Sequence, residues 1–164
     1  MEPLKKKKQF HYAWVIFAIS FFSVFTALGF CSSPKSLYLA AVTEDLNIPR
    51  SLFSLGNSVR FITTAVINLF FGKLVAKFGP RKLIAAGFIC LALFNLISSV
   101  ANNVALFSVS HIFFGLGLAW TTTSLVGIVV EKWFTSKKGT IMGFILAANG
   151  LGGAISSQII GDII

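Results

Sequence analysis

Long apolar stretches alternate with short, charged connections along the whole chain. A helix needs about 20 mainly apolar residues to cross the hydrocarbon of a bilayer, and five stretches are long enough. The predicted spans are residues 12–40, 52–75, 82–100, 104–130 and 139–160. The pattern predicts an all-α integral membrane bundle over residues 12–164, preceded by a basic amino-terminal arm over residues 1–11.

The composition agrees with a membrane protein. Hydrophobic residues make up 55% of the chain and charged residues 12%, and a soluble chain of this size could not bury so much apolar surface. The net charge of +9 does not indicate nucleic-acid binding, because the basic residues do not form a stripe on one folded face. Neither Cys31 nor Cys90 belongs to a metal-ligand spacing, so we expect no metal, no cofactor and no enzyme activity.

The basic residues gather in the amino-terminal arm and in alternate connections. Eleven of the fourteen lie on one side of a five-span arrangement: Lys5, Lys6, Lys7, Lys8, Lys73, Lys77, Arg81, Lys82, Lys132, Lys137 and Lys138. Cytoplasmic loops carry an excess of Lys and Arg. We therefore predict a multi-pass protein of the plasma (inner) membrane with a cytoplasmic amino terminus.

The connection between the second and third spans reads Gly-Lys-Leu-Val-Ala-Lys-Phe-Gly-Pro-Arg-Lys over residues 72–82. It suits a short reversal, because Gly72 allows helices to approach closely, Gly79 tolerates positive φ and Pro80 fits the first turn of a helix. The segment resembles the signature loop of the major facilitator superfamily, G-x-L-x-D-R-x-G-R-R/K. A generic basic loop is the alternative.

The resemblance implies that this connection is a conformational gating loop, to which Gly72, Lys77, Gly79 and Arg81 would contribute. Two positions depart from the pattern: its aspartate falls on Ala76, and its first arginine after the glycine falls on Pro80. In the family the aspartate helps to latch the cytoplasmic side. The latch is therefore in doubt in this chain.

A second segment, Glu-Lys-Trp-Phe-Thr-Ser-Lys-Lys-Gly over residues 131–139, is followed by Met142 and Gly143. It resembles a segment of the monocarboxylate and oxalate/formate porter branches of the same superfamily. The implied fold is five helices of an amino-terminal six-helix half, truncated relative to a twelve-span fold. The implied function is secondary transport of a small organic anion, such as a monocarboxylate, by alternating access, with proton coupling.

Ionisable residues at membrane depth are costly and mark ligand or ion pathways. Lys35 follows Pro34 in a Pro-Lys-Ser triplet that resembles the first span of monocarboxylate transporters, whose lysine binds the substrate carboxylate. The alternative is a lysine that extends to the outer headgroups. Arg60 shares a helix face with Asn57, Thr64 and Asn68, and it either binds a carboxylate or pairs structurally with another helix.

His111 is the third ionisable candidate and lies near the outer end of the fourth span. It either carries a proton or contacts an anion, or it is a hydrogen-bonded structural group. With Lys35, Arg60 and Asn57 it completes the predicted substrate-binding set. No acid within a span neutralises these cations, which favours a small anion as the ligand.

The fifth span carries a stripe of small residues, which predicts close helix packing: Gly143, Ala147, Gly150, Ala154, Ser157 and Gly161. With five spans, we expect function to need further carboxyl-terminal helices or a second copy of the chain. Two other functions stay open at this point. One is a non-transporting membrane assembly or regulatory protein, and the other is a half-transporter that works as a dimer.

Overall fold

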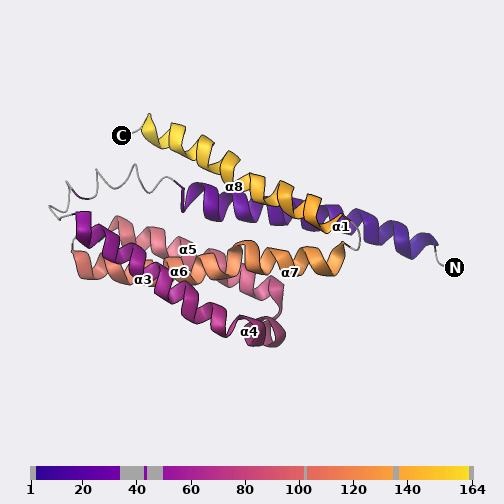
Figure 1. Ribbon diagram of the computed structural model, residues 1–164, viewed down its shortest axis with the longest axis horizontal. Coiled ribbons are helices and arrows are strands. Elements are labelled where there is room, and N and C mark those ends of the chain that lie inside the picture. The colour runs from indigo at the N-terminus through magenta and orange to yellow at the C-terminus, as the bar shows by residue number, and fades with distance from the viewer. Residues whose placement is uncertain (1–2, 34–42, 44–49, 102, 135–136, 163–164) are drawn as a thin grey trace.

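The structure is a computed structural model that describes residues 3–33, 43, 50–101, 103–134 and 137–162. These residues form a bundle of helices (Figure 1). The elements are α1 (Pro3–Val24), the π-helical turn η1 (Phe25–Phe30), α3 (Arg50–Leu69), α4 (Phe71–Phe78), α5 (Pro80–Ser99), α6 (Val104–Thr121), α7 (Thr123–Trp133) and α8 (Lys138–Gly161).

Four segments are long and apolar enough to cross a membrane: Ala13–Phe30, Pro80–Ser99, Val104–Trp133 and Lys138–Gly161. A fifth span results if Ser54–Leu69 and Phe71–Phe78, which meet at a 64° bend, are counted together. The described part of the chain contains helices and no strand. The predicted all-α membrane fold is therefore confirmed.

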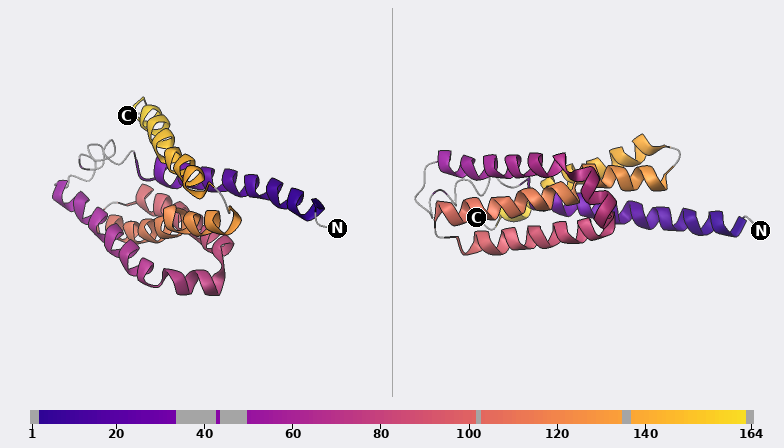
Figure 2. Two further views of the ribbon diagram at one scale, coloured as in Figure 1. Left: turned by 45° about the vertical axis from the view of Figure 1, so that its right-hand side comes forward. Right: turned by 90° about the horizontal axis from the view of Figure 1, so that it is seen from below.

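The helices divide into two packing groups. α6 lies along α5 and α3, whereas α1 with η1 lies across α8 (Figure 1; Figure 2). α7 continues the span begun by α6 but packs against α1 and α8. The change occurs at Thr122, whose extended backbone (φ −102°, ψ −162°) interrupts the helix. The fourth span thus belongs to one group in its first half and to the other in its second half.

Local sequence accounts for two of the helix ends. The side chain of Asn103 accepts a hydrogen bond from the Leu106 N–H at 2.7 Å and so caps the start of α6, which satisfies one free donor of the first turn. Gly79 ends α4 with φ 76° and ψ 156°, a conformation that only glycine adopts readily. Pro80 then opens α5, where its missing N–H costs nothing.

The π-helical turn η1 and α8 cross at glycines. A Cβ built on Gly152 would lie 2.7 Å from the Phe25 carbonyl oxygen and 2.9 Å from the Gly29 Cα atom. Ser156 donates a hydrogen bond to the Gly29 carbonyl at 2.8 Å beside this contact. Small residues permit the close backbone approach on which helix association in lipid depends.

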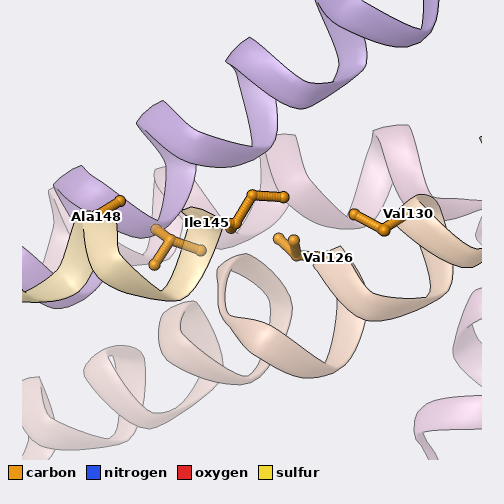
Figure 3. Close-up of a cluster of buried hydrophobic side chains, with 5 residues drawn as sticks. Val126, Val130, Ile145 and Ala148 are labelled. Atoms are coloured by element: carbon orange, nitrogen blue, oxygen red, sulfur yellow. The ribbon is translucent and has the colours of Figure 1, made fainter. Parts of the chain in front are cut away.

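A cluster of buried apolar side chains continues the contact toward α7. Its buried members are Val24, Val126, Val130, Ile145 and Ala148. Figure 3 shows Val126 and Val130 on α7 facing Ile145 and Ala148 on α8. The cluster connects α1, α7 and α8.

The predicted small-residue stripe of the fifth span lies on the other side of α8. Gly143, Ala147, Gly150 and Ala154 are exposed, and a Cβ at Gly143 or Gly150 would meet nothing within 4 Å. The close packing expected of the stripe is therefore not found among the described residues. The buried face instead carries Ile145, Ala148, Gly152 and Ser156.

The basic connections collect at one end of the bundle. The start of α1, the turn between α4 and α5 and the connection between α7 and α8 all lie toward the right in Figure 1. The start of α3, the turn between α5 and α6 and the end of α8 lie toward the left. The helix arrangement thus brings together the connections in which the cationic residues occur.

Gly152→Ala should destabilise the bundle by about 1–3 kcal/mol, because its methyl group would overlap backbone atoms that cannot move aside. Gly150→Ala is the matched control. It adds the same methyl group to open space on the same helix and should leave stability unchanged or raise it slightly. Thermal unfolding of both variants in detergent checks this, and equal melting temperatures would contradict the crossing.

Gly79→Ala should cost roughly 1–3 kcal/mol, because alanine must adopt φ near 76° to keep the turn between α4 and α5. The control is Gly72→Ala, a helical position with no atom near the added methyl group. Chemical unfolding followed by circular dichroism measures the difference. A Gly79→Ala protein as stable as Gly72→Ala would show that the turn does not need the glycine conformation.

Candidate anion site

Arg60 is a half-buried residue of α3 whose guanidinium contacts two aromatic rings. Its Cζ atom lies 4.0 Å from the ring centre of Phe61 and 5.5 Å from that of Phe114. One terminal nitrogen donates a long hydrogen bond of 3.4 Å to the Ser32 hydroxyl. The Nε atom is buried and has no hydrogen-bond partner in the described part of the chain. A buried donor of this kind is rare and leaves Arg60 able to bind a further acceptor.

His111 is buried on α6. Its Nδ1 atom lies 2.9 Å from the Phe107 carbonyl oxygen, and because a carbonyl only accepts, this nitrogen carries the proton that is donated. The ring also contacts Phe94, Phe107 and Phe114. The hydrogen bond fixes the ring, so that in the neutral imidazole the lone pair is on Nε2.

Phe114 connects the two cationic candidates. Its fully buried ring lies 5.5 Å from the Arg60 Cζ atom and 6.1 Å from the His111 ring centre, and it stacks on Phe94 at 4.3 Å. The structure therefore brings Arg60 and His111 close to one aromatic residue.

Glycines hold α3 and α6 close enough for this arrangement. A Cβ on Gly56 would lie 3.1 Å from ring atoms of His111, and one on Gly115 would lie 2.7 Å from the Arg60 carbonyl oxygen. Thr64 adds a hydrogen bond of 3.1 Å to the Gly115 carbonyl. Thr64, expected on the polar face of Arg60, therefore has a structural partner on α6.

The other predicted residues of the site differ in position. Asn57 is half-buried, one turn before Arg60 on the same helix, whereas Asn68 is exposed. Lys35 lies outside the described residues. The assignment of these side chains to a substrate site stays a prediction.

Three contributors were not expected from sequence: Ser32, Phe61 and Phe114. Ser32 follows the π-helical turn Phe25–Phe30, and π turns inside helices often occur at functional sites. Hydropathy does not reveal such a turn, and a phenylalanine among the chain's 18 has no sequence signal that separates a site ring from a lipid-facing one.

The charge of the site is positive. The sequence has no Asp or Glu between Arg50 and Val130, so no acid of these three spans neutralises Arg60. The described residues contain no group of three or more His, Cys, Asp or Glu that could hold a metal ion. The arrangement suits a carboxylate, which guanidinium binds through two parallel hydrogen bonds.

The predicted gating loop lies at the other end of α3. Gly79 has the expected positive φ. Gly72 was expected to allow a close helix approach, but a Cβ at this position would meet no described atom within 4 Å. Lys77 lies over the Phe78 ring at 5.5 Å, and Arg81 is exposed. Their role in gating stays a prediction.

The sequence is similar to parts of several longer transporters. The chain is 27% identical over 146 residues to the uncharacterized MFS-type transporter YcxA of Bacillus subtilis, covering 87% of this chain and 36% of the relative. It is 26% identical to the riboflavin transporter RibZ of Clostridioides difficile (92% and 33% covered). It is 30% identical to mouse monocarboxylate transporter 9 (86% and 28% covered).

The chain thus spans about a third of the length of these curated relatives. No solved structure matches it significantly. The family description "Major Facilitator Superfamily" matches residues 13–164, which include every span of the bundle. The chain therefore belongs to the major facilitator superfamily.

Proposed function

We propose that the protein takes part in secondary transport of a small organic anion, such as a monocarboxylate, by alternating access. The observation that carries the proposal is Arg60, a guanidinium within a span whose buried Nε atom has no partner among the described residues. A charge at this depth is costly unless it is paired. A carboxylate ligand supplies both the negative charge and the missing acceptor.

The surroundings of Arg60 select the shape of the anion. Phe61 and Phe114 flank the guanidinium and offer contact to the apolar part of a small ligand. Ser32 supplies a hydroxyl at 3.4 Å from the arginine. Lys35, close to Ser32 in the chain, would add a second cation to the same end of the first span.

The names of the relatives support transport but differ in substrate. One is named for riboflavin and another for monocarboxylates. The preference for a monocarboxylate therefore rests on the positive site and on the resemblance of the Pro-Lys-Ser triplet.

The assembly and the orientation belong to the same proposal. Further helices or a second copy would complete the pathway, since the chain spans about a third of its relatives. The basic end of the bundle, with the amino terminus and the gating loop, would face the cytoplasm across the plasma membrane. His111 would carry the coupled proton.

Arg60→Gln should lower carboxylate affinity by roughly 10–100-fold, because hydrogen bonds to a charged group contribute about 1.5–3 kcal/mol. Arg60→Lys should be intermediate, since it keeps the charge but not the paired donors. Lys132→Gln, which removes an exposed charge, is the control. The measurement is uptake of labelled monocarboxylates into proteoliposomes. The reconstituted protein is the chain together with any further residues that its gene encodes. Wild-type affinity in Arg60→Gln would reject the site.

His111→Gln should remove the part of the pH dependence of anion affinity that comes from the proton proposed for His111. Protonation of His111 adds positive charge near Phe114 and Arg60, so wild-type affinity should rise as pH falls. The same uptake assay, repeated at several pH values without a gradient, tests this. A variant that is less stable but keeps the wild-type pH profile would assign His111 a structural role alone.

A further inference from the structure

The short helix α4 departs from the span before it. α3 and α4 meet at a 64° bend next to Phe70. α3 contains 20 residues and rises about 30 Å, which already equals the thickness of the hydrocarbon core. By length alone α3 reaches across the core, although its apolar part Ser54–Leu69 counts as a span only together with Phe71–Phe78. The 64° bend directs α4 along the basic end of the bundle (Figure 1).

The eight residues of α4 are strongly segregated. At 100° per residue the large apolar side chains share an arc of about 100°: Phe71, Leu74, Val75 and Phe78. Lys73 and Lys77, one turn apart, lie on the other side and are exposed. A helix with one apolar face and lysines on the other is typical of the membrane–water boundary.

Little of the described chain covers this helix. α4 contains no buried residue, and the helices that it contacts most are its chain neighbours α3 and α5. Large apolar side chains around the bend are exposed, with Leu69 at 81%, Phe70 at 52% and Phe78 at 47%. These residues extend the apolar face of α4 into an exposed surface at the end of the span.

α4 contains no acidic residue that could neutralise Lys73 and Lys77 on its polar face. The position that is an aspartate in the family's loop is Ala76 in this chain. Lys73 has no ion-pair partner in the described part of the structure, and Lys77 contacts only the neighbouring Phe78 ring among the interactions found there. The helix therefore presents two exposed cations next to the end of α3.

We propose that α4 is a membrane-surface helix that binds the headgroups of anionic phospholipids. Its apolar face lies at the boundary of the acyl chains, and Lys73 and Lys77 contact headgroup phosphates. The 64° bend after α3 turns the helix away from the direction of the span, and the two lysines favour an anionic lipid over a zwitterionic one. The proposal does not depend on what the protein transports.

The position of α4 is tested first. The full chain, with Cys31 and Cys90 replaced by serine, receives a spin label at Leu74→Cys or at Lys73→Cys and is placed in nanodiscs. The label at Leu74→Cys should be accessible to oxygen dissolved in lipid, and the label at Lys73→Cys to a water-soluble nickel reagent. Labels that are equally accessible to the nickel reagent, or shielded from both reagents, would overturn the proposal.

The lipid preference is tested by a fluorophore at Ala76→Cys and brominated lipids that quench it. We expect phosphatidylglycerol to be enriched over phosphatidylcholine near the label. Each lysine removed should lower this enrichment roughly fivefold, and salt should weaken it. The test variant is Lys73→Gln/Lys77→Gln, and Lys132→Gln/Lys137→Gln is the control with equal charge removed from another basic connection.

The proposal is supported if the test variant loses the enrichment and the control keeps it. It is overturned if the wild-type chain shows no preference for phosphatidylglycerol, or if both double variants retain or lose the preference equally. A label that neither brominated lipid quenches would indicate that a protein surface covers α4 instead. Circular dichroism of each variant establishes that the helices are intact.

Discussion

Helices inside a bilayer gain little by burying apolar side chains against one another, because the surrounding lipid is equally apolar. Their association depends instead on how closely their backbones approach. In the described residues the closest backbone approaches are at Gly29 and Gly152 between η1 and α8, and at Gly115 between α6 and α3. Each lacks space for even one added carbon. The glycines therefore determine which helices touch and along which face.

The anion site is a consequence of these contacts. Gly56 accommodates the His111 ring, and Gly115 lies against the backbone of Arg60. Arg60, on one helix, and His111, on another, are thereby both held near the ring of Phe114. A bulkier residue at Gly56 or Gly115 would separate α3 from α6 and with it the two cationic groups. The glycines that allow α3 and α6 to pack closely thus also set the distance between Arg60 and His111.

The break at Thr122 has a related effect. α6 belongs to the group that contains Arg60, whereas α7 packs with α1 and α8. The fourth span therefore connects the site to the crossing at Gly29 and Gly152. A helix that continued straight through Thr122 would follow only one of the two groups.

The overall fold follows from sequence because span length and loop charge are properties of whole segments. The apolar lengths predict a helical membrane bundle, and the positive φ at Gly79 is expected from the turn that it makes. Features that depend on neighbouring helices could not be predicted. Gly150 and Gly152 are both glycines of α8, yet of these two only Gly152 lies against another helix among the described residues.

The candidate site was predictable only in part. The charges of Arg60 and His111 stand out because ionisable groups are rare in spans. Ser32 and Phe114 become evident only when the π-helical turn and the approach of α3 to α6 are known. The bend before α4 was likewise hidden, since hydropathy records that a segment is apolar and not where its axis turns.

We propose that Arg60, which has no acidic partner among the described residues, binds a carboxylate within the membrane. Solid-state NMR tests it directly, with nitrogen-15 in the arginine side chains and carbon-13 in the carboxyl group of added lactate. Binding at Arg60 should give a dipolar coupling between the Arg60 Nε atom and the lactate carboxyl carbon that disappears in Arg60→Lys. No coupling at saturating lactate, or one that persists in Arg60→Lys, would contradict it.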